Sequence, residues 1–132
     1  MKIETSAKAS FNAESVNRPY QAGKVRSLQH AGGVIRLIAS RSIRVTKRKP
    51  GQPGGPPNSR GGAGSIKTAI AYALAAGVVV IGYRFSVIGT VGAVHEFGQN
   101  YKGQQFEKRP TLAPALAKAL PRIPEGWRGI LR

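Results

Sequence analysis

A Pro/Gly-rich segment divides the chain and limits what either half can fold into. This segment, residues 50–65, reads PGQPGGPPNSRGGAGS, and most of its residues are Gly or Pro. Such a composition cannot bury apolar surface and need not hold one conformation, so we predict a flexible loop here. A chain of 132 residues is long enough for one domain, 1–132, in which this loop joins two structured halves.

The half before the loop has the pattern of a long helix. Asn12 is a suitable cap for a helix that starts at residue 13, and Pro19 should interrupt or restart that helix. Apolar residues then recur every three or four positions between residues 19 and 46: Leu28, Ala31, Ile35, Ile38, Ala39 and Ile43. Gly32 and Gly33 lie inside this pattern, which predicts a close helix crossing or a bend. Residues 1–11 are expected to form an extended arm or a first strand.

The half after the loop begins with two apolar segments. Residues 66–74 read IKTAIAYAL and residues 77–85 read GVVVIGYRF, which predicts two strands joined in a hairpin at Ala75-Ala76-Gly77. A helix over residues 65–76 is the alternative for the first segment, because that segment is rich in Ala.

Two further helices are expected nearer the end of the chain. Residues 90–98 should form a short helix that packs through Val91, Val94 and Phe97 and stops at Gly98. Residues 99–108 read as a polar loop. Pro110 should open a second helix, with an apolar stripe of Leu112, Ala115, Leu116, Ala119 and Leu120. Pro121 and Pro124 should end that helix, and residues 125–132 should form a short tail.

His95 and Glu96 are the residues that most suggest chemistry. A zinc protease needs a second His one turn after the first, and Gln99 occupies that position. A Ser–His–Asp triad lacks its Asp, and the chain has no Cys. We therefore expect no enzyme, no metal and no cofactor. The pair should lie on the edge of a packed helix, with Glu96 bound to Arg109 across the 99–108 loop.

The charge of the chain requires anionic partners. Lys and Arg total 21 against 5 acidic residues, which gives a net charge of +16. Six of the basic residues gather near the end of the predicted long helix: Arg36, Arg41, Arg44, Lys47, Arg48 and Lys49. They are candidate contacts for nucleic-acid phosphates or for an acidic protein, and a solvated face is the alternative. No aromatic residue separates Tyr20 from Tyr72, which argues against a base-stacking surface.

A membrane role is not expected. The first ten residues, MKIETSAKAS, contain no apolar stretch of the kind found in signal peptides. The longest apolar run, AIAYALAAGVVVIGY, has fifteen residues and contains a Gly. A spanning helix needs about 20 apolar residues, so this run suits strands better.

The order of these segments carries a family resemblance over residues 11–124. It resembles the neck, tail-completion and virion-morphogenesis proteins of tailed bacteriophages, a superfamily that includes the lambda-type minor tail protein Z. The matching residues are Ala39, Arg41, Ile43, Val79, Ile81, Gly82, His95, Glu96, Phe97, Gly98, Arg109, Pro110, Leu112, Pro114, Ala115 and Leu116. The chain has Thr111 where the family often has Phe, and its Pro/Gly loop is long.

The resemblance implies a fold and a role. The fold would be α+β, with a long N-terminal helix and a C-terminal helix packed on a small antiparallel sheet. The role would be structural, in a homo-oligomeric, usually hexameric, ring that joins the head connector to the tail in the virion. His95, Glu96, Phe97, Gly98, Arg109 and Pro110 would be packing elements. The basic residues would mostly contact acidic protein, with a minority facing genomic DNA in the channel.

Two other functions remain open at this stage. A tail terminator at the top of the tail tube fits the same resemblance. A small basic nucleic-acid-binding protein of ribosomal or nucleoid type fits the charge, and it would bind free duplex in a strongly salt-dependent way.

Overall fold

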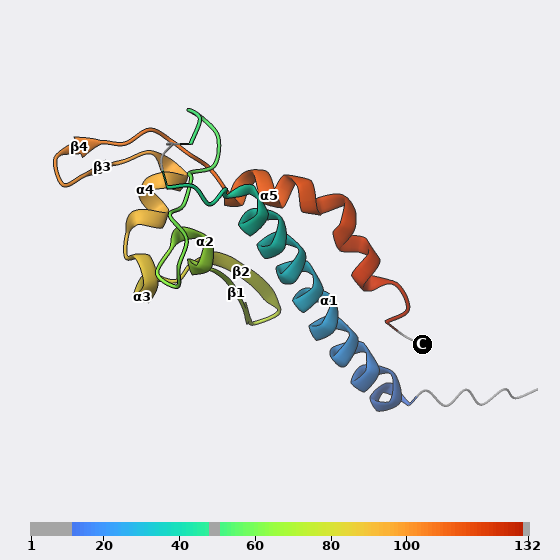
Figure 1. The fold of residues 1–132 in the computed structure, drawn as a ribbon. Coiled ribbons are helices and arrows are strands. Elements are labelled where there is room, and N and C mark those ends of the chain that lie inside the picture. Colours follow the sequence, from blue (N-terminus) through green and yellow to red (C-terminus); the bar gives the residue numbers. More distant parts are fainter. Residues whose placement is uncertain (1–11, 48–50, 131–132) are drawn as a thin grey trace, which may run out of the picture.

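The computed structural model describes residues 12–47 and 51–130, and it confirms the expected α+β class, with a long N-terminal helix, a C-terminal helix and a small antiparallel sheet (Figure 1). The elements follow in this order: α1 (Ala13–Ser42), α2 (Ile66–Ala69), β1 (Ile70–Ala75), β2 (Val78–Tyr83), α3 (Phe85–Ile88), α4 (Val91–Phe97), β3 (Asn100–Tyr101), β4 (Gln104–Gln105), α5 (Leu112–Ala119) and the 3-10 helix η1 (Leu120–Trp127). The predicted arm, 1–11, lies outside the described residues.

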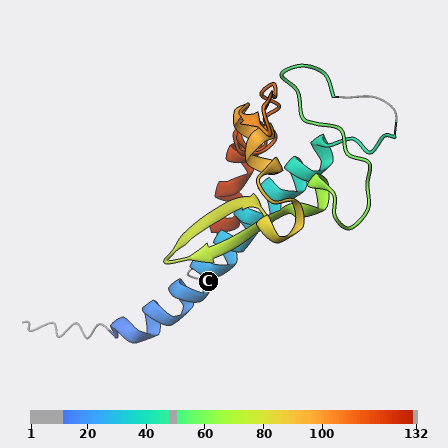
Figure 2. The ribbon, with the colours of Figure 1, turned by 90° about the vertical axis from the view of Figure 1, so that its left-hand side faces the viewer.

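Helix α1 lies between the β1–β2 hairpin and the α5–η1 segment (Figures 1 and 2). Two glycines nine positions apart mark its two contact faces, because nine residues turn an α-helix by about 180°. A Cβ on Gly32 would lie 2.4 Å from the Tyr72 ring of β1, and a Cβ on Gly23 would lie 2.8 Å from Ile130. The close approach expected at Gly32 is therefore made to a strand, not to another helix.

Helix α1 begins with the predicted cap at Asn12, but it has no break at Pro19. The Asn12 side chain accepts hydrogen bonds from the backbone N–H groups of Glu14 and Ser15, at 3.1 and 3.3 Å. Pro19 lies inside the helix, so the predicted interruption there is wrong. Pro19 has no N–H, so the carbonyl of Ser15 lacks the donor that it would have in an uninterrupted helix. Ser15 is exposed, so water can donate to that carbonyl instead.

The end of α1 comes four residues before the predicted limit. Ile43 is already extended, at φ −84° and ψ 114°, and it is fully buried. Beyond it the chain pairs with the Pro/Gly loop, since Ser59 N–H donates to Arg44 C=O and Thr46 N–H donates to Ser59 C=O, both at 2.8 Å. These bonds take the backbone groups that a longer helix would have used.

The first apolar segment forms both of the predicted alternatives, a short helix followed by a strand. Its first four residues form α2, capped by the Ser65 hydroxyl, and only Ile70–Ala75 form a strand. The hairpin itself is confirmed, with Ala75 paired to Val78 across a two-residue turn. Both turn residues have positive φ, 48° at Ala76 and 77° at Gly77, as a tight hairpin turn of this hand requires.

Helix α4 is confirmed, and Gly98 ends it at φ +67°. Its apolar face differs from the prediction, because Val94 is buried whereas Phe97 is 65% exposed. The segment 99–108 is more ordered than a loop. It contains the small β3–β4 hairpin, which turns at Lys102 and Gly103, both with positive φ.

Helix α5 begins two residues later than predicted. Thr111 is its N-cap and Pro110 precedes the cap, so Pro110 does not open the helix. Ala115 and Ala119 are buried against α1, but Leu116 and Leu120 are exposed. The chain does not leave as a tail. Residues 120–127 form η1, where the Gly126 carbonyl accepts a hydrogen bond from Ser27 of α1.

The core of the described chain is small. It consists of seven clustered side chains from α1, the residue after it, α2, β1 and α5: Ile35, Ala39, Ile43, Ile66, Ile70, Ala115 and Ala119. Three of the seven are Ala, which bury little apolar area each. By contrast, residues 12–22 of α1 are exposed throughout. The fold therefore leaves much apolar surface on the outside.

Candidate functional site

The carboxylate of Glu96 is the most heavily bonded side chain in the described structure, and it lies 6% exposed below the start of α5. Its oxygens accept backbone N–H groups from Thr111 at 2.9 Å, Leu112 at 3.1 Å and Ala113 at 3.0 Å. The next residue, Pro114, has no N–H. One carboxylate therefore satisfies every backbone donor that this helix end leaves free.

This role differs from the predicted one. Glu96 does not form an ion pair with Arg109, so that prediction is wrong. Arg109 instead donates its backbone N–H to the His95 carbonyl at 2.6 Å and its guanidinium to the carbonyl of Gly51 in the Pro/Gly loop. Its guanidinium also lies 3.5 Å from the carboxylate of Glu107. Arg109 thus anchors a different loop from the one expected.

His95 lies beside this carboxylate in sequence but does not join it. Its Nδ1 is buried and has no hydrogen-bond partner in the described chain. Burial, followed by the positive charge of Arg109, lowers the pKa of His95. Within residues 12–47 and 51–130 no three His, Cys, Asp or Glu side chains gather where they could hold a metal ion. Backbone donors occupy the Glu96 oxygens, so Glu96 caps the start of α5, and His95 takes no part in that cap.

Tyr83 of β2 completes the cap, donating its hydroxyl to Glu96 Oε2 at 3.4 Å. Burial, together with the charge of Glu96, raises the pKa of Tyr83 to about 12. The pKa of Tyr in an unfolded chain is about 10, so above that pH the unfolded state loses a proton that the folded state keeps. This group's contribution is complete below pH 10 and is lost as the pH rises toward 12.

We therefore expect the protein to lose roughly 2 to 3 kcal/mol of stability between about pH 10 and 12 through Tyr83. Tyrosinate absorbance would show one of the four tyrosines titrating late. The Tyr83→Phe variant should lack both the late titration and that part of the alkaline loss. If all the tyrosines titrated together near pH 10, the buried contact would be absent in solution.

The second candidate site is a basic cleft of about 540 Å³ at the end of α1. Arg41 and Ser42 come from the last turn of α1, Arg44 from the segment after it, and Lys118 from α5. The Pro/Gly loop supplies the opposite wall: Gln52, Gly55, Pro56 and Asn58. We call this site the basic cleft. Its lining contains three cations, no acidic residue and no aromatic residue.

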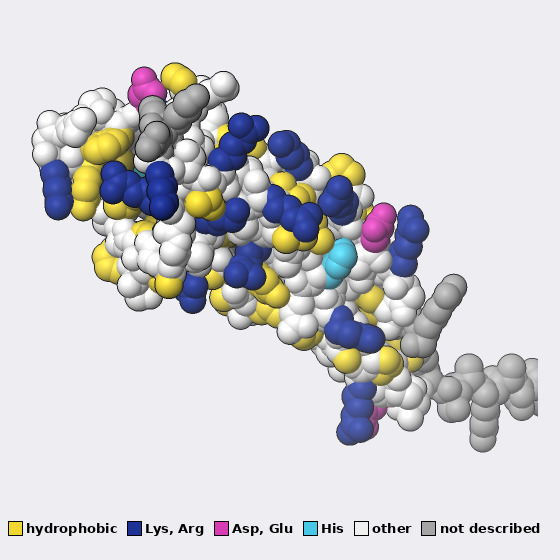
Figure 3. Space-filling model, in the orientation of Figure 1, with side chains coloured by type: hydrophobic (Ala, Val, Ile, Leu, Met, Phe, Trp, Pro, Cys, Tyr) yellow, Lys and Arg dark blue, Asp and Glu magenta, His cyan; other side chains and the backbone are white. Residues whose placement is uncertain are grey.

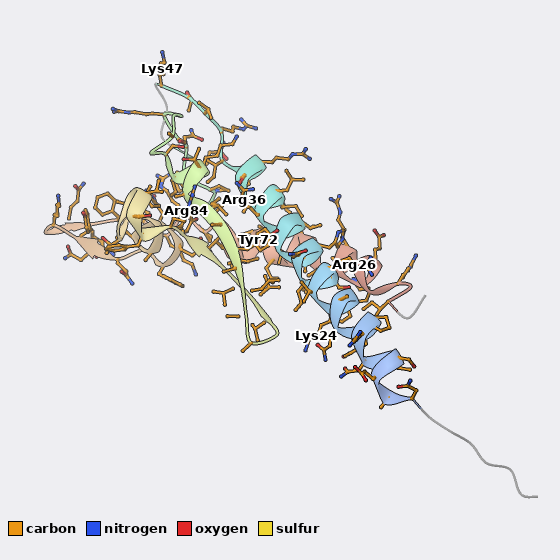
Figure 4. The ribbon with its side chains drawn as sticks, turned by 90° about the horizontal axis from the view of Figure 1, so that it is seen from below. Lys24, Arg26, Arg36, Lys47, Tyr72 and Arg84 are labelled. Atoms are coloured by element: carbon orange, nitrogen blue, oxygen red, sulfur yellow. The ribbon has the colours of Figure 1, made fainter. Side chains whose placement is uncertain are left out.

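The six basic residues that the sequence predicts as contacts for an anionic partner do not form one site. Arg41 and Arg44 lie in the basic cleft. Arg36 does not, because its Nε donates to the Ile70 carbonyl of β1 at 3.0 Å and so links helix to hairpin. Lys47 is exposed beyond the end of α1, as Figure 4 shows. Arg48 and Lys49 lie outside the described residues.

Sequence reasoning missed Lys118 and the loop wall of this cleft. No spacing signal connects Lys118 to Arg41, since the two meet only through the packing of α5 against α1. Figure 3 shows Lys and Arg side chains along the whole face in view, with acidic side chains at only a few points.

The outer face of the β1–β2 hairpin is a third feature, and sequence reasoning missed it too. Ala73, Ala75, Val78 and Val80 point away from α1, and the two valines are 58% and 55% exposed. The signal was present in the sequence, because AYALAAGVVVIGY has no polar residue at alternate positions. Strands without such alternation are typically covered on both faces.

Comparison of the chain with protein-family models, with curated proteins and with solved structures finds no match. Among the described residues, no helix has both the length and the hydrophobicity needed to cross a bilayer.

Proposed function

We propose that this chain is a structural, non-enzymatic subunit of a homo-oligomeric ring, usually hexameric in the family it resembles, at the head–tail junction of a tailed bacteriophage virion. The sequence resemblance supplies the phage context, and the apolar outer face of the hairpin supplies the case for assembly. Its partners would be neighbouring copies, the head connector and the tail proteins. Genomic DNA in the channel would touch a minority of its basic residues.

The observation that carries the proposal is the uncovered hairpin face. Four small apolar side chains lie together on it, and no described element covers them. Fully burying a Val side chain contributes about 1.5 kcal/mol or more, and Val78 and Val80 are each a little more than half exposed. A neighbour that covers both therefore contributes roughly 2 kcal/mol before the entropic cost of association. The exposed first part of α1, with Val16 and Tyr20, offers a second, different surface. Two different surfaces suit a head-to-tail contact, which gives a ring where the rotation from one subunit to the next closes.

The tail-terminator role would use the same ring and the same surfaces. The nucleic-acid-binding alternative draws its support from the net charge of +16 and from the basic cleft, and it leaves the hairpin face without a purpose. We therefore favour the ring at the junction.

The test is a charge placed on the hairpin face. Wild-type protein should form a discrete ring of about six subunits at low and at moderate salt, and the number of subunits should not depend on added duplex DNA. Val80→Glu should leave subunits that are folded by circular dichroism but no longer assemble, because a carboxylate cannot be buried there unpaired. Solution mass measured by analytical ultracentrifugation reports both results.

Leu37→Glu is the matched control, since it places the same charge at an exposed apolar position of α1 that belongs to neither of the two proposed surfaces. A ring that survives Leu37→Glu but not Val80→Glu assigns the contact to the hairpin. A wild-type protein that stays monomeric and binds duplex tightly, with a steep loss on adding salt, would contradict the ring and favour the nucleic-acid-binding alternative.

A further inference from the structure

We propose that the basic cleft binds the phosphodiester backbone of duplex DNA without reading its sequence. This inference deepens the proposed function, because it assigns the DNA-facing minority of the basic residues to one site. The site is built by three side chains from separate segments: Arg41 at the end of α1, Arg44 after it and Lys118 on α5.

The three cations of the cleft have no acidic partner among the described residues. Glu14 pairs with Arg18 and Glu107 with Arg109, whereas Glu96 is occupied by backbone donors. Glu125, in η1, forms no ion pair within residues 12–47 and 51–130. Cations held together in this way repel one another even in water. A fold that gathers them without acids is stabilised by a bound anion.

The helix end does not account for these cations. A cation near a helix C-terminus commonly serves the exposed carbonyl groups there. At this end, Lys67 donates to the Ile43 carbonyl at 3.3 Å, and the Ser42 hydroxyl donates to the Ala39 carbonyl at 2.7 Å. In the described chain, the guanidinium groups of Arg41 and Arg44 donate no such hydrogen bond to a carbonyl at the helix end. They therefore remain available to a ligand.

The loop wall of the cleft is held in place by contacts outside the cleft. The Arg109 guanidinium binds the Gly51 carbonyl at one end of the wall. At the other end, Ser59 bonds through its backbone to Arg44 and Thr46. A Cβ on Gly51 would meet the Pro56 carbonyl at 2.5 Å, so the loop is also tight within itself. A wall fixed in this way loses little conformational freedom when a ligand binds.

The lining favours duplex phosphates over a single strand and over an acidic peptide. Single-strand sites stack bases on aromatic side chains, and this lining has none. Protein–protein contacts draw most of their energy from aromatic and arginine anchors packed in desolvated pockets. This lining has arginines but no aromatic residue, and Pro56 is its one apolar side chain. A site that offers charge without aromatic anchors matches the sequence-independent, electrostatic mode of DNA backbone binding.

The test measures how binding of a short duplex depends on salt. Three phosphate contacts predict a slope of about −2.7 for log K against log salt, and each contact contributes about eightfold in affinity at 0.1 M salt. Arg41→Gln, Arg44→Gln and Lys118→Gln should each reduce the slope by about 0.9 and weaken binding by about that eightfold factor. Duplexes of different sequence should bind alike.

Arg26→Gln is the matched control, because it removes the same charge from the same helix about 22 Å away from Arg41. It lies on the exposed side of α1, as Figure 4 shows. It should leave the slope almost unchanged. Equal slopes for Arg26→Gln and the three cleft variants would show that binding is spread over the whole basic surface, which overturns the proposal.

Two other probes separate the possible sources of negative charge. Inorganic phosphate alone should bind far more weakly than the duplex, and equal affinity would mean a free-phosphate site. Poly-glutamate that binds through the same three residues more tightly than DNA would mean an acidic protein partner. Either result overturns the DNA proposal. Ring mass, measured separately for each cleft variant, should not change, so failure here is distinct from failure of the ring.

Discussion

Replacing Glu96 with Ala should lower the free energy of unfolding by about 3 kcal/mol, because three backbone N–H groups lose a charged acceptor at once. Thr111 is 1% exposed, so its N–H cannot turn to water in the variant. The first turn of α5 would then fray, and Ala115 and Ala119 would pack less firmly on α1. Urea unfolding followed by circular dichroism gives the loss directly.

Two variants separate the cap from a general effect of charge. Glu96→Gln keeps the shape and one acceptor oxygen, so it should cost less than Glu96→Ala. Glu107→Ala removes a carboxylate that is largely exposed, and its effect should stay within about 0.5 kcal/mol. A cost below about 1 kcal/mol for Glu96→Ala would show that the carboxylate does not hold α5 in solution.

The sequence placed α4 correctly and put Val94 on its buried side, but it put Phe97 there where the structure has Glu96. Val91 and Phe97 are six positions apart, which turns a helix by about 600°, so their side chains diverge by about 120°. Residues that are spaced by three therefore do not stay on one face of a helix over two turns. Phe97 ends up exposed and Glu96 buried, because the start of α5 lies over Glu96. Nothing local to residues 90–98 signals that contact.

Local turn chemistry was predictable, and long-range contacts were not. Gly at the second position of both hairpin turns, Gly77 and Gly103, permits the positive φ that those turns need. The sequence predicts the turn at Gly77, whereas for residues 99–108 it predicts a polar loop and not the turn at Gly103. The basic cleft depends instead on α5 approaching α1, which brings Lys118 beside Arg41. Such tertiary packing also determines where α1 ends, since the loop captures the backbone of Arg44 and Thr46.

Replacing Gly32 with Ala should destabilise the protein by about 2 kcal/mol, although Ala is the better helix former. The added Cβ would lie 2.4 Å from Cδ2 and 2.7 Å from Cγ of the Tyr72 ring, so α1 and the hairpin must move apart. Overpacking costs about 1 to 3 kcal/mol, and a contact as short as 2.4 Å belongs at the upper end of that range. After the gain of about 1 kcal/mol from helix propensity, a net loss of about 2 kcal/mol remains. Thermal or urea unfolding measures the difference.

Gly33 supplies the matched control, because a Cβ there would meet no atom within 4 Å. Gly33→Ala should therefore stabilise the same helix by about 1 kcal/mol, which leaves a gap of about 3 kcal/mol between two neighbouring glycines. Removing the obstacle should reverse the first result: in a Tyr72→Ala background, Gly32→Ala should become stabilising as well. If Gly32→Ala and Gly33→Ala had the same effect in the wild-type chain, the hairpin would not pack on α1 at Gly32, and the exposed face assigned to β1 and β2 would have to be reassigned with it.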